Sequence, residues 1–138
     1  MNKGNIFIDT SGFYAALVTG DSAHNKARKL LGELARSKRT AITTDYIVDE
    51  TSTLLKARGV SGAIVPFFDM LKTSKALTLR FIDEDVFDDA TAMFLKRSDQ
   101  SYSFTDCTSF LVMKQLKLDK ALTTDLHFQN EGFHVLLR

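Results

Sequence analysis

Short apolar runs alternate with amphipathic segments along this 138-residue chain, and this alternation limits the folds that it can adopt. The runs predict short strands at residues 5–8, 40–43, 77–82, 121–122 and 133–137. Apolar residues at helical spacing predict helices over residues 10–17, 22–37, 44–58, 61–73, 83–95 and 103–116. Strands that alternate with helices favour an α/β domain with a central, mainly parallel five-stranded sheet and helices on both faces.

The composition is that of an ordinary globular domain. Hydrophobic residues make up 44% and charged residues 25%, and the formal net charge of +1 gives no overall signature of nucleic-acid binding. One domain over residues 1–138 is expected. The single cysteine, Cys107, lies in an apolar helical segment and is expected to be buried and unreactive. The first apolar run is too short for a signal peptide and no stretch is long enough to cross a membrane, so a cytoplasmic protein is expected.

Acidic residues occur where predicted strands pass into helices. Asp9 directly follows the strand at 5–8, and Asp125 lies just beyond the strand at 121–122. Asp106 lies in the first turn of the helix at 103–116. Glu50 lies near the core-facing side of its helix, whereas Asp49 points away from that side. Because ligands of open parallel sheets bind at the carboxyl ends of the strands, these acids are expected at one edge of the sheet.

Each acid alone also has a structural explanation. Asp9 and Asp125 would serve as helix caps, Asp106 would form a capping box with Ser103, and Glu50 would pair with Arg58 or Arg80. Taken together, the four acids are better explained by a shared cation.

Mg²⁺ or Mn²⁺ fits carboxylate ligands best. Zinc fits less well, because Cys107 and the three histidines, His24, His127 and His134, show no chelating spacing. A divalent ion held by carboxylates activates water for hydrolysis of a phosphodiester bond.

Four motifs carry a resemblance to a known family: FIDTSGFYAAL, YIVDETSTLL, SYSFTDCTSF and ALTTDLHFQNEGF. With these motifs in this order, the chain resembles VapC-like toxin ribonucleases of type II toxin-antitoxin systems, which belong to the PIN-domain family. The resemblance covers essentially the whole chain. It implies a PIN-like fold and a Mg²⁺- or Mn²⁺-dependent endoribonuclease that hydrolyses RNA. It also assigns Asp9, Glu50, Asp106 and Asp125 as the catalytic and metal-binding residues.

The resemblance suggests supporting roles for further residues. The hydroxyls of Thr10 and Ser11 would bind a carboxylate or a metal-bound water, or would only cap the helix. Asp99 would assist a second metal ion or be a plain loop aspartate, so one or two ions remain open. His127 and Phe128 are expected to serve packing and local hydrogen bonding. The implied partners are an RNA substrate, a small antitoxin whose basic side chain enters the acidic pocket, and a second copy of the chain in a homodimer.

Other functions stay open at this point. A non-catalytic PIN-like RNA-binding module would be expected to lack some of the acids, and a PIN nuclease could act on DNA or in RNA processing. A phosphoaspartate receiver needs adjacent acids after the first strand, and a haloacid-dehalogenase-like phosphatase needs a second aspartate two residues after the first. Thr10 and Ser11 follow Asp9 here, which disfavours both.

Overall fold

The five predicted strands form one sheet in the order β3-β2-β1-β4-β5. The structure is a computed structural model that describes residues 4–138. The strands are β1 (Ile6–Ile8), β2 (Ala41–Thr44), β3 (Leu77–Arg80), β4 (Lys120–Leu122) and β5 (His134–Val135). All pairings between them are parallel, which confirms the predicted sheet. The last strand is shorter than the predicted 133–137, although Leu136 and Leu137 still donate backbone hydrogen bonds to the chain around β4.

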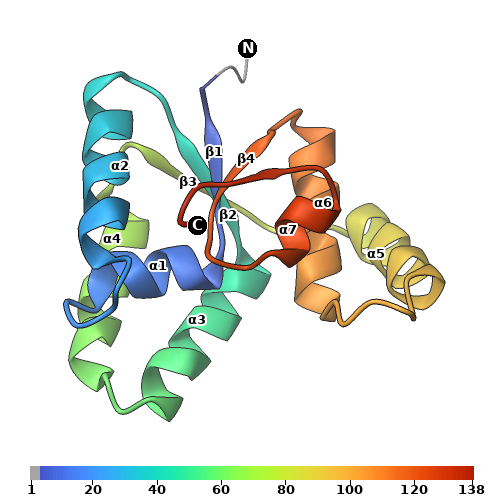
Figure 1. The fold of residues 1–138 in the computed structure, drawn as a ribbon, viewed down its shortest axis with the longest axis horizontal. Helices are drawn as coiled ribbons and strands as arrows, with labels where there is room; N and C mark the ends of the chain where they lie inside the picture. The colour runs from blue at the N-terminus through green and yellow to red at the C-terminus, as the bar shows by residue number, and fades with distance from the viewer. Residues whose placement is uncertain (1–3) are drawn as a thin grey trace.

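Helices flank the sheet on both sides, as expected. They are α1 (Thr10–Leu17), α2 (His24–Arg36), α3 (Asp45–Ala57), α4 (Ile64–Thr73), α5 (Glu84–Lys96), α6 (Phe104–Gln115) and α7 (His127–Asn130), with a 3₁₀ turn at Ser61–Ala63. In Figure 1, α1, α2 and α4 gather to the left of the strands and α5 and α6 to the right. Helix α7 was not predicted, because four residues are too few to show helical periodicity. No helix within residues 4–138 is both long and apolar enough to cross a bilayer.

The core lies between the sheet and these helices and anchors the loop after β4. Phe128, in α7, is completely buried and packs edge-to-face on Phe110 of α6, with ring centroids 5.0 Å apart. It also lies 6.3 Å from the ring of Phe7 in β1. The Cys107 thiol is buried and its pKa is raised to about 11, chiefly by burial, which agrees with the predicted unreactive role.

The ends of β1 and β4 are held in register at the edge where the acids lie. Phe7 pairs with Ala121 and Ile8 with Leu122, so Asp9 follows β1 beside the residue that follows β4, Thr123. Helix α1 starts close to this edge, and a Cβ atom on Gly12 would lie 2.1 Å from the carbonyl oxygen of Leu122. Only glycine permits this close approach.

Candidate active site

The four acids that the sequence singles out lie close together, and their mutual charge raises the pKa of three of them: Asp9, Glu50 and Asp106. Asp106 and Glu50 both raise the pKa of Asp9, and Asp106 and Asp125 both raise that of Glu50. Asp125 in turn raises the pKa of Asp106. The acids come from four places in the chain: the end of β1, helix α3, the start of α6 and the loop after β4. The fold therefore brings the predicted quartet together at the carboxyl edge of the sheet.

Asp9 is the most deeply buried of the four, with 6% of its surface exposed. Burial is the main reason that its pKa is raised to about 7, and the charges of Asp106 and Glu50 add to the effect. A 2.8 Å hydrogen bond from Thr123 Oγ1 to Asp9 Oδ2 opposes the shift by stabilising the carboxylate. The Asp9 side chain makes no capping hydrogen bond to α1, so a simple cap does not explain its position.

Glu50 is only half-buried and accepts a hydrogen bond of 2.5 Å from Thr10 Oγ1. Its pKa is raised mainly by burial. Asp49, beside it, is exposed, as the helical pattern predicts. Neither Arg58 nor Arg80, the two arginines expected as partners of Glu50, forms an ion pair with Glu50. The Arg80 guanidinium donates to Gln115, and that of Arg58 lies over the ring of Tyr14.

Asp106 has two roles in the structure. Its backbone N–H donates to Ser103 Oγ at 3.0 Å, and its Oδ2 accepts from the Ser103 backbone N–H at 3.1 Å, which confirms the capping box. Its side chain is nonetheless turned into the acidic group, where burial chiefly raises its pKa. The capping box and the predicted place in the quartet are therefore compatible, because the cap orients the carboxylate.

His127 joins the group, and the sequence did not predict this. Its Nδ1 lies 3.2 Å from Asp106 Oδ2 and 3.4 Å from Asp125 Oδ1, and its backbone N–H donates to Asp125 Oδ1 at 2.9 Å. Possible ligand atoms of Asp106, Asp125 and His127 all lie within 4.8 Å of one another. The predicted packing and local hydrogen bonding of His127 are also present, through Tyr102 and Ser101. The only sequence signal was a histidine two residues after an acid at a strand end.

The hydroxyl residues after Asp9 bind carboxylates and the neighbouring loop. Thr10 donates to Glu50, as described, and Thr51 donates to Thr10 at 3.3 Å. Ser11 Oγ lies 3.4 Å from Asp9 Oδ2 and accepts from the Thr124 backbone N–H at 2.9 Å. Of the two alternatives for these hydroxyls, the structure shows the carboxylate contact.

Asp99 is not a member of the group of ligand atoms formed by Asp106, Asp125 and His127. It is exposed in the loop between α5 and α6, and Asp106, Asp125 and His127 form their cluster without it. Its predicted role in a second metal site stays a hypothesis.

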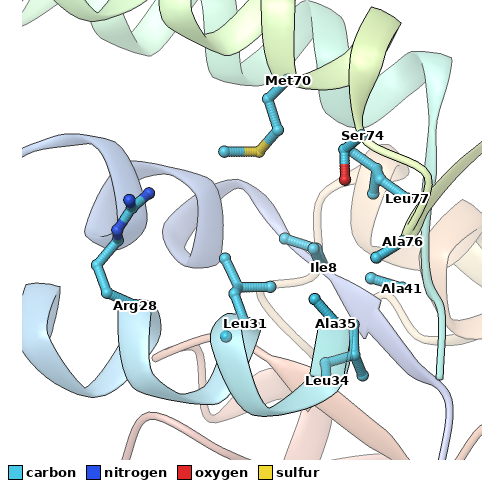
Figure 2. A pocket seen from close by; sticks show the side chains of 11 residues that line it. Ile8, Arg28, Leu31, Leu34, Ala35, Ala41, Met70, Ser74, Ala76 and Leu77 are labelled. Carbon is cyan, nitrogen blue, oxygen red and sulfur yellow. The ribbon is translucent and has the colours of Figure 1, made fainter. Parts of the chain in front are cut away.

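Two cavities differ in chemistry. One of about 230 Å³ opens beside the acids and is lined by Asp9, Ser11, Tyr14, Arg58 and Asp125, among others. Another, also of about 230 Å³, lies between α2, α4 and the strands (Figure 2) and is lined mainly by apolar side chains such as Leu31, Met70 and Leu77. No acidic side chain lines the second cavity. Only the first adjoins groups suited to metal-assisted hydrolysis.

Comparison with known proteins agrees with this geometry. No family model matches the chain. The chain is 32% identical over 129 residues to VapC20 of Mycobacterium tuberculosis, described as a 23S rRNA-specific endonuclease, in two strains of that organism. The match covers 93% of this chain and 95% of the relative.

The crystal structure of M. tuberculosis VapC20, described as a sarcin-ricin loop cleaving toxin, superposes with a TM-score of 0.80 at 29% identity. This match also covers 93% of this chain and 95% of that one. Sequence identity, coverage and fold agree, and the chain belongs to the VapC-like branch of the PIN-domain family.

Proposed function

We propose that this chain is a metal-dependent endoribonuclease that hydrolyses RNA phosphodiester bonds as the toxin of a toxin-antitoxin pair, with residues 1–138 as a single PIN domain. The observation that carries the proposal is the convergence of Asp9, Glu50, Asp106 and Asp125 at one edge of the sheet. Within the described residues, His127 is the only basic group that forms an ion-pair contact with any of the four. Such a concentration of negative charge, with Asp9 and Asp106 buried, is costly unless a cation neutralises it.

The donor set fits a hard divalent cation. Carboxylate oxygens are the ligands that Mg²⁺ and Mn²⁺ prefer, and the ligand atoms of Asp106, Asp125 and His127 are already grouped. We assign Asp9, Glu50, Asp106 and Asp125 as the residues that hold the ion, with Asp99 as a candidate for a second one. When bound, such an ion lowers the pKa of a coordinated water and neutralises charge on the leaving oxygen.

Hydrogen bonds from neighbouring side chains orient the carboxylates of this site. Thr123 and Thr10 donate hydrogen bonds that orient the carboxylates of Asp9 and Glu50. His127 spans Asp106 and Asp125 and holds their oxygens toward each other. Outer contacts of this kind fix the direction of metal ligands and tune their affinity.

The substrate proposal follows from the relatives. VapC20 is described as specific for 23S rRNA and as cleaving the sarcin-ricin loop. A stem-loop RNA with that sequence is therefore the first substrate to test here. A nuclease that acts on DNA, or one that processes RNA without being a toxin, would reveal itself by different products.

Exposed apolar side chains support the proposed protein partners. Val65 and Phe68 on α4 and Phe87 and Leu95 on α5 remain 45% to 68% exposed. Such surfaces are typical of protein interaction sites. The antitoxin, the homodimer and the cytoplasmic location stay predictions.

The proposal is tested by mapping RNA ends after induced expression in cells. The wild-type chain should produce new ends concentrated at one or a few sites, and Asp106→Asn should abolish them. Asp89→Asn is a matched control, because it removes the same charge from an exposed position on α5. New ends that persist in Asp106→Asn, or that appear in DNA alone, would contradict the proposal.

A further inference from the structure

Arg58 is a cation at the rim of the acidic cavity, immediately after the last turn of α3. Its Cζ lies 4.9 Å from the centroid of the Tyr14 ring, which comes from α1. Asp9, Ser11 and Asp125 line the same cavity. The side chain is therefore held beside the acids by an aromatic ring.

Within the described residues, Arg58 forms no ion pair with an acid, although Asp9, Asp21 and Asp125 line the same cavity. Among residues 4–138, neither the ion pairs nor the side-chain hydrogen bonds include its guanidinium. A cation–π contact is made to the face of the ring and leaves the guanidinium N–H groups free to donate. Arg58 thus keeps its donors next to a site whose own residues would bind a cation.

RNA needs a positive group at such a place. A phosphodiester chain that approaches four carboxylates is repelled, and one bound divalent ion would offset only part of their negative charge. The planar fork of arginine matches two phosphate oxygens. Stacking on Tyr14 also restricts the side chain, so less conformational entropy is lost when it binds.

We propose that Arg58, braced by Tyr14, binds a phosphate of the RNA strand next to the one that is cleaved. This inference rests on the proposed ribonuclease function and adds a subsite that positions the substrate. The competing explanation is structural: Arg58 would only stabilise α3, because a cation at the C-terminal end of a helix interacts favourably with the helix dipole. A purely structural Arg58 would affect thermal stability and leave RNA affinity unchanged.

The test compares Arg58→Gln with Lys56→Gln. Both remove one positive charge, and Lys56 is exposed two residues earlier in α3 but does not line the acidic cavity. With a fluorogenic sarcin-ricin stem-loop RNA and Mn²⁺, Arg58→Gln should raise KM about tenfold, the size expected for loss of one charged hydrogen-bonding contact. Lys56→Gln should leave KM within about twofold, because an exposed charge outside the site contributes little.

Binding provides a readout that does not depend on cleavage. In an Asp106→Asn background, fluorescence anisotropy with labelled stem-loop RNA should show weaker binding for Arg58→Gln at low salt. The slope of log affinity against log salt should become shallower by about 0.7 to 0.9, the value for one lost phosphate contact. Arg58→Lys should recover part of the affinity, because it restores the charge without the planar fork.

Metal binding separates substrate contact from support of the site. Calorimetry with Mn²⁺ alone should show that Arg58→Gln does not weaken metal affinity. Weaker Mn²⁺ binding, or RNA affinity and KM equal to those of Lys56→Gln, would overturn the proposal for Arg58 while leaving the nuclease intact. Wild-type protein that binds RNA without cutting it would overturn the proposed function alone, and wild-type protein that binds no RNA would overturn both.

Discussion

Thr123 Oγ1 donates a 2.8 Å hydrogen bond to Asp9 Oδ2 and so joins the end of β4 to the end of β1 at the acidic site. Thr123 is completely buried, and its hydroxyl oxygen also accepts from the Asp125 backbone N–H at 3.0 Å. One side chain therefore sets the positions of two members of the quartet. Its contact with Asp9 also lowers the pKa of a carboxyl group that burial raises.

Thr123→Val should weaken Mn²⁺ binding at pH 7 by about tenfold, as expected for loss of a group that orients a ligand. Without the donor, the pKa of Asp9 rises further and less of its carboxylate is available. Calorimetry measures the change. Thr43→Val is the matched control, because that buried hydroxyl donates to the carbonyl of Ile8 and not to an acid. Equal losses of Mn²⁺ affinity in both variants would contradict the assigned role.

In the metal-free protein, the contribution of the acidic site to the free energy of unfolding should fall as pH rises from about 4 to 8. Asp9 has a pKa of about 7 when folded, above its ordinary value of 3.8, so the folded chain holds more protons in this window. Proton release then favours the unfolded chain. The pKa values of Glu50 and Asp106 are raised in the same direction.

Asp9→Asn should therefore stabilise the metal-free chain at pH 8 by on the order of 2 to 4 kcal/mol, and much less at pH 4. Urea unfolding in EDTA at the two pH values measures this difference. The same variant should bind Mn²⁺ more weakly. If Asp9→Asn is instead less stable than wild type at pH 8, the charged Asp9 carboxylate does not destabilise the metal-free fold.

Gly12→Ala should destabilise the fold by about 2 to 4 kcal/mol, because the added methyl would meet the backbone carbonyl of Leu122 at 2.1 Å. A backbone atom cannot move aside as a flexible side chain can. Gly62→Ala serves as control, since a Cβ there has no neighbour within 4 Å. Equal midpoints of thermal unfolding for the two variants would count against this close packing.

Ser109→Ala should stabilise the protein by about 1 kcal/mol. Ser109 is completely buried in α6, and its hydroxyl has no hydrogen-bond partner among the described residues. Alanine removes the buried polar atom and keeps the helix. Denaturant unfolding checks the change, and a marked loss of stability would mean that the hydroxyl is satisfied by a group such as a buried water.

Much of the fold follows from local pattern. Strand-helix alternation predicts the parallel sheet, and Pro66 lies in the first turn of α4 as a proline must. The acids at the ends of β1 and β4 could be placed because strand ends in a parallel sheet share an edge. Glu50 could be placed because its position on the helical face set it apart from Asp49.

The rest depends on contacts between distant segments. Thr123 was absent from the predicted site, because nothing local shows that it faces Asp9, 114 residues away. His127 was assigned to packing because its approach to Asp106 needs the folded loop after β4. Helix α7, which carries His127, is anchored by the buried ring of Phe128 and not by a periodic pattern of its own.

The most direct test of the central claim is cleavage of purified stem-loop RNA by wild-type protein and by Asp106→Asn, with and without Mn²⁺. Asparagine keeps the size of the side chain and an oxygen for the capping box, while removing the charge. We predict Mn²⁺-dependent cleavage by the wild type and a loss of about 100-fold or more in the variant, which a cooperative thermal unfolding transition should show to be folded. Equal cleavage by the two proteins, or wild-type cleavage that persists at full rate in EDTA, would contradict a metal-dependent site built from these acids.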